Sequence, residues 1–175
     1  MQEIVCFDGG FADRIARSLG GLLELDFYVA AQKVKGDLPG LSSNLNLVED
    51  FFYMGIFSKI DGGVEAYAII LMDIASADEM VSRLTNEHIS VLDEYKSSAV
   101  QEFANIIIGA FSSEAEKRAQ RRVDYTIPTI AVDHPNALVD AICAYLSEME
   151  TASTLEIEIS CRIPPILVKM ILCFR

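Results

Sequence analysis

Apolar residues recur at helical spacing in four stretches of the chain. In the first stretch, Phe11, Ile15 and Leu19 are each four residues apart, which places them on one face of a helix. The last stretch has Asp133 and Pro135 at its start, a pairing typical of a helix N-terminus. Helices are therefore expected over residues 10–24, 73–84, 92–118 and 133–149.

Six shorter apolar stretches have the length and composition of β-strands. They span residues 25–34, 51–60, 64–74, 121–132, 153–163 and 166–174. Asp61, Gly62 and Gly63 join the second stretch to the third, which is a strong hairpin signal. Pro128 lies inside the fourth stretch, and a proline cannot donate to a sheet ladder. Its position is therefore expected to be a sheet edge, a bulge or an exit from the strand.

The order of these elements predicts the fold class. Each half of the chain runs helix, strand, connection and then two adjacent strands, although the residues themselves do not repeat. The apolar strands need cover, so we expect an α+β layered domain in which long helices pack on an antiparallel sheet, with pseudo-twofold character. We expect residues 1–175 to form one domain, with halves of about 1–88 and 89–175.

Charge and hydropathy narrow the choice of partners and compartment. The 175 residues are 51% hydrophobic and carry a formal net charge of −12, which nucleic acid and anionic membranes repel. A basic protein surface is a more suitable partner. The first residues resemble no signal peptide, and no stretch is apolar enough to cross a membrane. A cytoplasmic protein is expected.

The cysteines and histidines supply little metal or triad chemistry. Cys6, Cys143, Cys161 and Cys173 are scattered, without the spacing of a zinc site or the density of a disulfide scaffold. Two histidines also leave few candidates for metal ligands or a histidine-based triad. We therefore expect reduced cysteines and no cofactor of the protein's own.

The long helix carries a narrow polar stripe among apolar residues. Ser98, Glu102 and Asn105 fall within an arc of about 60° on a helix that turns 100° per residue. Gly109 falls on the same stripe, where a missing side chain opens the backbone to close approach. Many amphipathic helices have such a stripe, so the helix alone does not identify a site.

The spacing from this stripe to Pro128 is more specific. Ser98, Glu102, Asn105 and Pro128 follow the pattern Ser/Asp-x3-Glu-x2-Asn-x22-Pro, with no insertion or deletion. This pattern resembles the active-site signature of the CheC/CheX/FliY chemotaxis phosphatases. The stretches "SAVQEFANIIIGAF" and "IPTIAVDHPNALVDAI" also resemble the family, and the resemblance extends over roughly residues 52–150.

The resemblance implies removal of the phosphoryl group from the aspartate of a phosphorylated CheY-like receiver domain. In such a site Asn105 would position the attacking water, and Glu102 would pair with the receiver's lysine. Ser98 would add a supporting hydrogen bond, while Pro128 would shape the neighbouring strand and Gly109 would leave space. Magnesium would belong to the receiver. A carboxamide suits the water-positioning task because it both donates and accepts hydrogen bonds.

The first half of the chain departs from the family pattern. CheC proteins commonly carry a second Glu-x-x-Asn pair on their first helix, but this sequence has "CFDGGFADRIAR" there. The sequence therefore resembles a one-site member, either CheX-like or a CheC relative with a degenerate first site. A non-catalytic module that docks a receiver domain or a CheD-type deamidase remains the alternative.

Two further questions stay open at this stage. A motor-switch component of the FliY type is a third reading, although the sequence shows no appended domain that would favour it. The apolar stretch 166–174 suits either a central strand or a homodimer interface.

Overall fold

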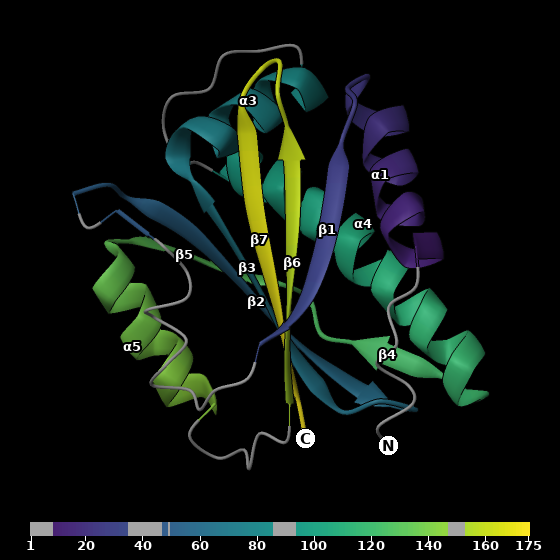
Figure 1. Cartoon of the computed structure of the whole chain (residues 1–175). Helices are drawn as coiled ribbons and strands as arrows, with labels where there is room; N and C mark the ends of the chain where they lie inside the picture. The colour runs from purple at the N-terminus through teal and green to yellow at the C-terminus, as the bar shows by residue number, and fades with distance from the viewer. Residues whose placement is uncertain (1–8, 35–46, 49, 86–93, 147–152) are drawn as a thin grey trace.

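The computed structural model describes residues 9–34, 47–48, 50–85, 94–146 and 153–175 (Figure 1). The expected helices and strands are present, with boundaries shifted by a few residues. The expected connection over residues 36–46 and the outermost ends of two expected helices lie outside the described residues. The elements are α1 (Gly9–Leu23), β1 (Tyr28–Val34), β2 (Tyr53–Gly62), β3 (Ala66–Asp73), α3 (Ile74–Thr85), α4 (Glu94–Ala119), β4 (Val123–Tyr125), β5 (Thr129–Asp133), α5 (Pro135–Leu146), β6 (Ser153–Cys161) and β7 (Ile166–Phe174).

The strands form one antiparallel sheet in the order β1-β6-β7-β3-β2-β4, with β5 also paired to β2. The hairpins β2–β3 and β6–β7 occupy its centre, so the apolar strand β7 is a central strand. Each half of the chain lends an edge strand to the other half's hairpin, since β1 pairs with β6 and β4–β5 pair with β2. The expected α+β class, with helices on an antiparallel sheet, is confirmed.

One face of the sheet carries three helices. In Figure 1, α4 passes diagonally behind the sheet, α1 lies beside β1 in contact with α4, and α3 lies at the top. Alternate residues of the strands point into this layer, where they meet the apolar faces of the helices. Phe11 and Phe111 meet edge to face with ring centroids 6.0 Å apart, which joins α1 to α4. Burial of α4 along this side fixes the direction of its opposite, exposed side.

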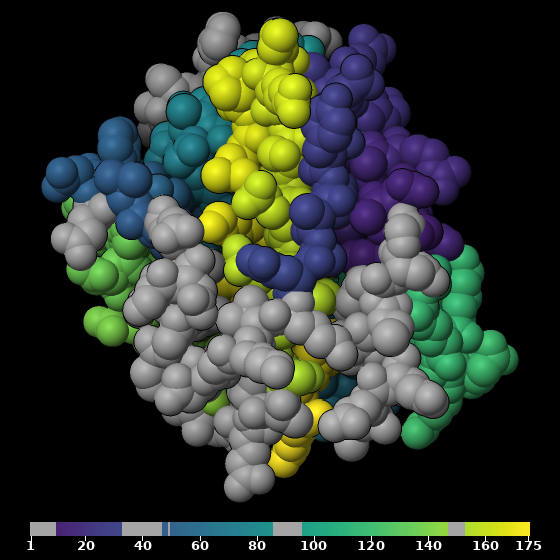
Figure 2. Space-filling view, in the orientation of Figure 1, coloured from purple at the N-terminus to yellow at the C-terminus, as the bar shows by residue number. Residues whose placement is uncertain are grey.

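The other face of the sheet is covered in part by α5, which packs on β2, β3 and β7. Leu138, Ile142 and Leu146 enter this smaller core. Beyond α5, the side chains of β1, β6 and β7 form the upper part of the surface in Figure 2. Asp133, which the sequence placed at the start of this helix, lies just outside it. Its carboxylate accepts from the His134 amide at 2.8 Å, because the helix begins one residue later than expected.

The three described cysteines form no disulfide with one another. Cys161 and Cys173 are buried and Cys143 is half-buried, whereas Cys6 lies outside the described residues. Burial raises the pKa of the Cys173 thiol to about 11, although a hydrogen bond with Thr154 opposes the rise. Within the described ranges, no helix combines the length and apolarity that a membrane crossing requires.

The strand around Pro128 is interrupted by a bulge. Tyr125 pairs with Ile60 and Thr129 pairs with Phe57, so three residues of the edge strand stand opposite only two of β2. One extra residue of this kind is a β-bulge. The proline therefore lies at an edge and at a bulge, two of the three arrangements that the sequence suggested.

Hydrogen bonds from β2 hold this bulge in place. The buried Ser58 hydroxyl donates to the Thr126 carbonyl at 2.8 Å, and the Thr126 amide donates to the Lys59 carbonyl at 2.9 Å. The Lys59 amide donates in turn to the Thr126 hydroxyl at 3.0 Å. The backbone amide, carbonyl and hydroxyl of Thr126 are thus satisfied, and Tyr125 and Pro128 on either side of the bulge contact α4.

Candidate active site

The polar stripe of α4 lines a shallow depression on the molecular surface. Ser98, Glu102 and Asn105 are exposed, and they line this depression of about 580 Å³ with the half-buried Gln101 and Ile106. We call it the α4 groove. The structure therefore brings three of the predicted site residues together in one open concavity.

The buried side of α4 explains why the groove is held in place. Phe103, Ala104 and Ile107 are fully buried, and they alternate along the sequence with the exposed groove residues. A helix fixed by such packing presents its opposite side in one orientation. The carboxylate of Glu102 and the carboxamide of Asn105 are thus carried by a rigid element, one turn apart.

Pro128 lies beside the groove without lining it. Its side chain is buried, and its carbonyl accepts from the Gln101 side-chain amide at 3.0 Å. Gln101 therefore ties α4 to the bulge immediately next to Glu102. The hydrogen-bonded link between Pro128 and the stripe is therefore indirect: the proline carbonyl is bound by Gln101, which neighbours Glu102.

Gly109 continues the stripe beyond the groove and makes room for Tyr125. A methyl group on Gly109 would lie 3.3 Å from the Tyr125 hydroxyl, which is a tight contact. The same hydroxyl lies 3.5 Å from the backbone carbonyl of Asn105, at the long limit of a hydrogen bond. The missing side chain thus allows a tyrosine of the edge strand to lie against α4 beside Asn105.

Sequence reasoning singled out neither Gln101, Ile106 nor Tyr125. Gln101 precedes Glu102 directly, and its polar side chain within an apolar stretch was a usable signal. Tyr125 had no such signal, because its approach to Gly109 depends on the register of β4 against β2. The groove offers a carboxylate, two carboxamides and a hydroxyl. Within the described part of the chain, no cluster of metal-ligating side chains is found.

The first half has a counterpart of this region, and a shared helix ending identifies it. Glu24 follows α1 with a φ of 54°, and Gln120 follows α4 with a φ of 52°. Three residues later each chain segment buries an apolar residue, Phe27 or Val123, at the edge of the sheet. Asn105 lies fifteen residues before Gln120, and the residue fifteen before Glu24 is Gly9. The first helix therefore has no side chain at the counterpart of Asn105.

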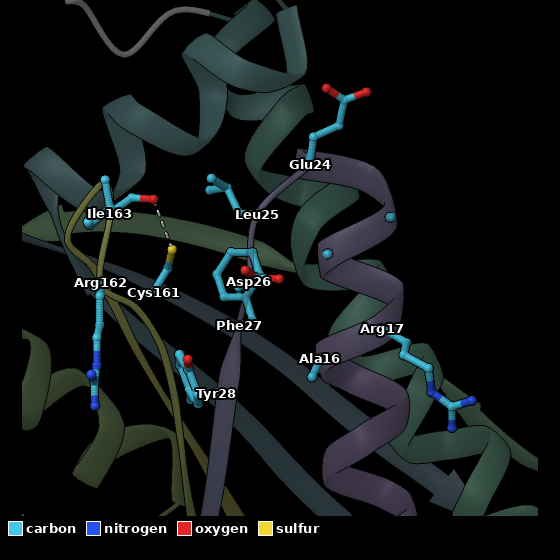
Figure 3. Close-up of a pocket in the computed structure, with 12 residues that line it drawn as sticks. Ala16, Arg17, Glu24, Leu25, Asp26, Phe27, Tyr28, Cys161, Arg162 and Ile163 are labelled. Carbon is cyan, nitrogen blue, oxygen red and sulfur yellow. Dashed lines mark hydrogen bonds between the residues drawn. The ribbon is translucent and has the colours of Figure 1, made fainter.

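A larger cavity, of about 850 Å³, lies at the end of α1 (Figure 3). It is bounded by the last turns of α1, the start of β1 and the β6–β7 turn. Figure 3 shows Arg17 and Arg162 on opposite sides of the opening and directed away from it. Arg162 lies over the Tyr28 ring, 5.4 Å from its centroid. Its described lining includes the carboxylates of Glu24 and Asp26 but no carboxamide, so it lacks the carboxylate–carboxamide pair that the α4 groove presents.

Comparisons with known proteins relate the chain to chemotaxis proteins. The family model for the chemotaxis phosphatase CheX matches residues 54–141, a segment that contains the whole α4 groove and the bulge. No curated protein matches the sequence. Among solved structures, CheX in a CheX–CheY–BeF3–Mg complex from Borrelia burgdorferi is 19% identical with a TM-score of 0.62, covering 95% of this chain and 96% of that one.

Two further CheX structures agree over almost the full length. CheX from Desulfovibrio desulfuricans is 12% identical with a TM-score of 0.65, and the alignment covers 99% of both chains. The Vibrio vulnificus protein is 14% identical with a TM-score of 0.64, also over 99% of both chains. These identities are low, so the structures show a shared fold. With the family model matching across the groove, the chain belongs to the CheX family of chemotaxis phosphatases.

Proposed function

We propose that this protein hydrolyses the phosphoaspartate of a CheY-like receiver domain, with the α4 groove as its active site. The observation that carries the proposal is the placement of Glu102 and Asn105, exposed side by side in one groove on a helix whose other side is buried. Family membership supports the same reaction class. The Borrelia burgdorferi relative is described in complex with CheY and magnesium.

Asn105 supplies the water-positioning group. Hydrolysis joins a water oxygen to phosphorus and breaks the bond from phosphorus to the aspartate oxygen, releasing the carboxylate and inorganic phosphate. An acyl phosphate already has a good leaving group, so placing the water in line with that bond is the main contribution needed. The Asn105 carboxamide can accept from the water and donate to a receiver oxygen at once, without changing protonation state.

Glu102 supplies the contact that orients the two proteins. Its carboxylate is exposed one turn from Asn105, where a cation of the receiver can reach it. Ser98, one turn further, offers a hydroxyl to the same partner surface. Magnesium belongs to the receiver in this proposal, and residues of this chain act on water and partner.

A second candidate is a non-catalytic module that docks a receiver domain or a CheD-type deamidase. The exposed Glu102 favours it as much as it favours catalysis, because a docking carboxylate serves either role. The two candidates differ in one measurable property, which is the lifetime of the phosphoryl group once the proteins have bound.

The test is the decay of a phosphorylated receiver with and without this protein, together with binding of the same receiver. Faster release of inorganic phosphate supports the phosphatase. Binding of the phosphorylated receiver with an unchanged lifetime contradicts it and favours the docking module. A panel of receivers is needed, since the cognate regulator is not specified by the groove.

A further inference from the structure

The bulge between β4 and β5 lies against the α4 groove over two turns of the helix. Pro128 is held by Gln101 at one end of this contact, and Tyr125 lies against Asn105 and Gly109 at the other. Ile127 stands between these two anchored residues, yet 82% of its surface is exposed. Residues 125–128 therefore form a wall beside the groove. In this wall the Tyr125 side chain is directed onto the helix and the Ile127 side chain is directed to solvent.

Tyr125 has the position of a residue that holds Asn105 in place. Its hydroxyl lies 3.5 Å from the Asn105 backbone carbonyl, and the same hydroxyl lies 3.3 Å from the place where a methyl group on Gly109 would stand. A hydrogen bond this long adds little to the stability of the fold. The same contact is made to Asn105, the residue proposed to position water. A small displacement of that residue would slow hydrolysis of the phosphoaspartate.

Ile127 has the position of a contact for the partner protein. An isoleucine with most of its surface in water gains free energy when a partner covers it. Any receiver that brings its phosphoaspartate to Asn105 must lie alongside the wall that carries Ile127. The first half lacks this arrangement. Tyr125 lies five residues after the left-handed Gln120, and the residue five after the left-handed Glu24 is Val29.

We propose that this wall is a working part of the phosphatase site, in which Tyr125 is a positioning residue for Asn105 and Ile127 is a docking contact for the receiver domain. The inference rests on the proposed function and adds residues outside the predicted signature. It separates the two roles, since one residue acts on turnover and the other on affinity.

Steady-state hydrolysis of a phosphorylated receiver tests both roles. Tyr125→Phe is expected to lower kcat by about threefold to tenfold with KM unchanged, the range that one neutral hydrogen bond can supply. Ile127→Ser is expected to raise KM by about tenfold with kcat unchanged, because apolar contact area is lost. Tyr28→Phe and Ile163→Ser are matched controls, as both residues are exposed and lie outside the wall.

Gly109→Ala distinguishes a positioning role from a general structural one. Its new methyl group would crowd the Tyr125 hydroxyl, so it should slow turnover in the wild-type background. In a Tyr125→Phe background that oxygen is absent, and Gly109→Ala should then have little further effect. Unfolding of each variant by denaturant reports whether stability has changed.

The possible results separate this inference from the proposed function. An active wild-type protein with the two expected kinetic changes supports the wall. Wild-type kinetics in both Tyr125→Phe and Ile127→Ser would overturn the wall while leaving the phosphatase proposal standing. An inactive wild-type protein, tested on receivers that it binds, overturns the proposed function and the wall with it.

Discussion

The two halves of the molecule repeat the same packing but differ in what they expose. Both α1 and α4 bury one apolar side against the sheet and end in a left-handed residue, Glu24 or Gln120. In α4, Glu102 and Asn105 are presented from a formed helix, whereas Gly9, which has no side chain, stands at the counterpart of Asn105 in α1. The same helix-on-sheet packing thus forms in both halves, although only the described part of α4 carries the carboxylate and carboxamide pair.

The halves also differ beyond the helix ends. At the end of α4, the Gly63 amide donates to the Arg122 carbonyl at 2.8 Å, so the β2–β3 turn closes on the chain that follows α4. At the end of α1, the neighbouring turn is β6–β7, which contains Arg162 and Ile163, and the cavity of Figure 3 separates that turn from α1. Glycine in one turn and larger residues in the other account for a closed and an open end.

The largest expected effect tests the shared packing. Ile15 and Phe111 each lie nine residues before the left-handed residue of their helix, and both are buried. Phe111→Ala should lower the free energy of unfolding by about 3–5 kcal/mol and Ile15→Ala by about 2–5 kcal/mol. Denaturant unfolding measures both, with the exposed Ser18→Ala as control. A loss below about 1 kcal/mol in either helix would break the equivalence of the two cores.

Charge reversal at Glu102 tests the chemical difference between the halves. Glu102→Arg should raise KM for a phosphorylated receiver about 100-fold, because an attractive contact becomes a repulsive one. Glu116→Arg makes the same change in net charge at an exposed position further along α4. Equal effects of the two substitutions would attribute docking to overall charge instead of the groove.

Gly62 tests why the β2–β3 turn is closed against the chain that follows α4. This residue has a φ of 107°, and a methyl group there would collide with the Arg122 carbonyl. Gly62→Ala should therefore lower the free energy of unfolding by about 1–3 kcal/mol. Thermal or denaturant unfolding checks the value, and unchanged stability would show that the turn does not need glycine.

The smallest expected effect comes from the open end of the first half. A methyl group on Gly21 of α1 would meet no heavy atom within 4 Å. Gly21→Ala should raise the free energy of unfolding by about 0.5–1 kcal/mol, since alanine loses less backbone entropy in a helix. Destabilisation instead would indicate that the cavity is narrower than in Figure 3.

The sequence predicted the elements of the fold because their signals are local. The spacing of Phe11, Ile15 and Leu19 identified a helix, and Asp61-Gly62-Gly63 identified a hairpin before any partner strand was considered. The positions of Ser98, Glu102 and Asn105 on one exposed helical side followed in the same way. Their catalytic and docking roles remain predictions.

The rest of the site depends on contacts between distant segments. Nothing in the local sequence specifies that three residues around Pro128 stand opposite two of β2, or that Gln101 reaches the proline carbonyl. The approach of Tyr125 to Gly109 arises from the same register. The cavity at the end of α1 was also unforeseen, because its size depends on how closely the β6–β7 turn approaches that helix.

The central claim is that Asn105 positions the attacking water, and one rate comparison tests it most directly. Phosphorylated receiver is mixed with wild-type protein, with Asn105→Ala or with Asn136→Ala, an equally conservative change at an exposed residue of α5. Receiver binding and unfolding are measured for each, since alanine preserves the helix. We expect Asn105→Ala to bind without accelerating decay and Asn136→Ala to match the wild type. Wild-type decay rates with Asn105→Ala would contradict the claim.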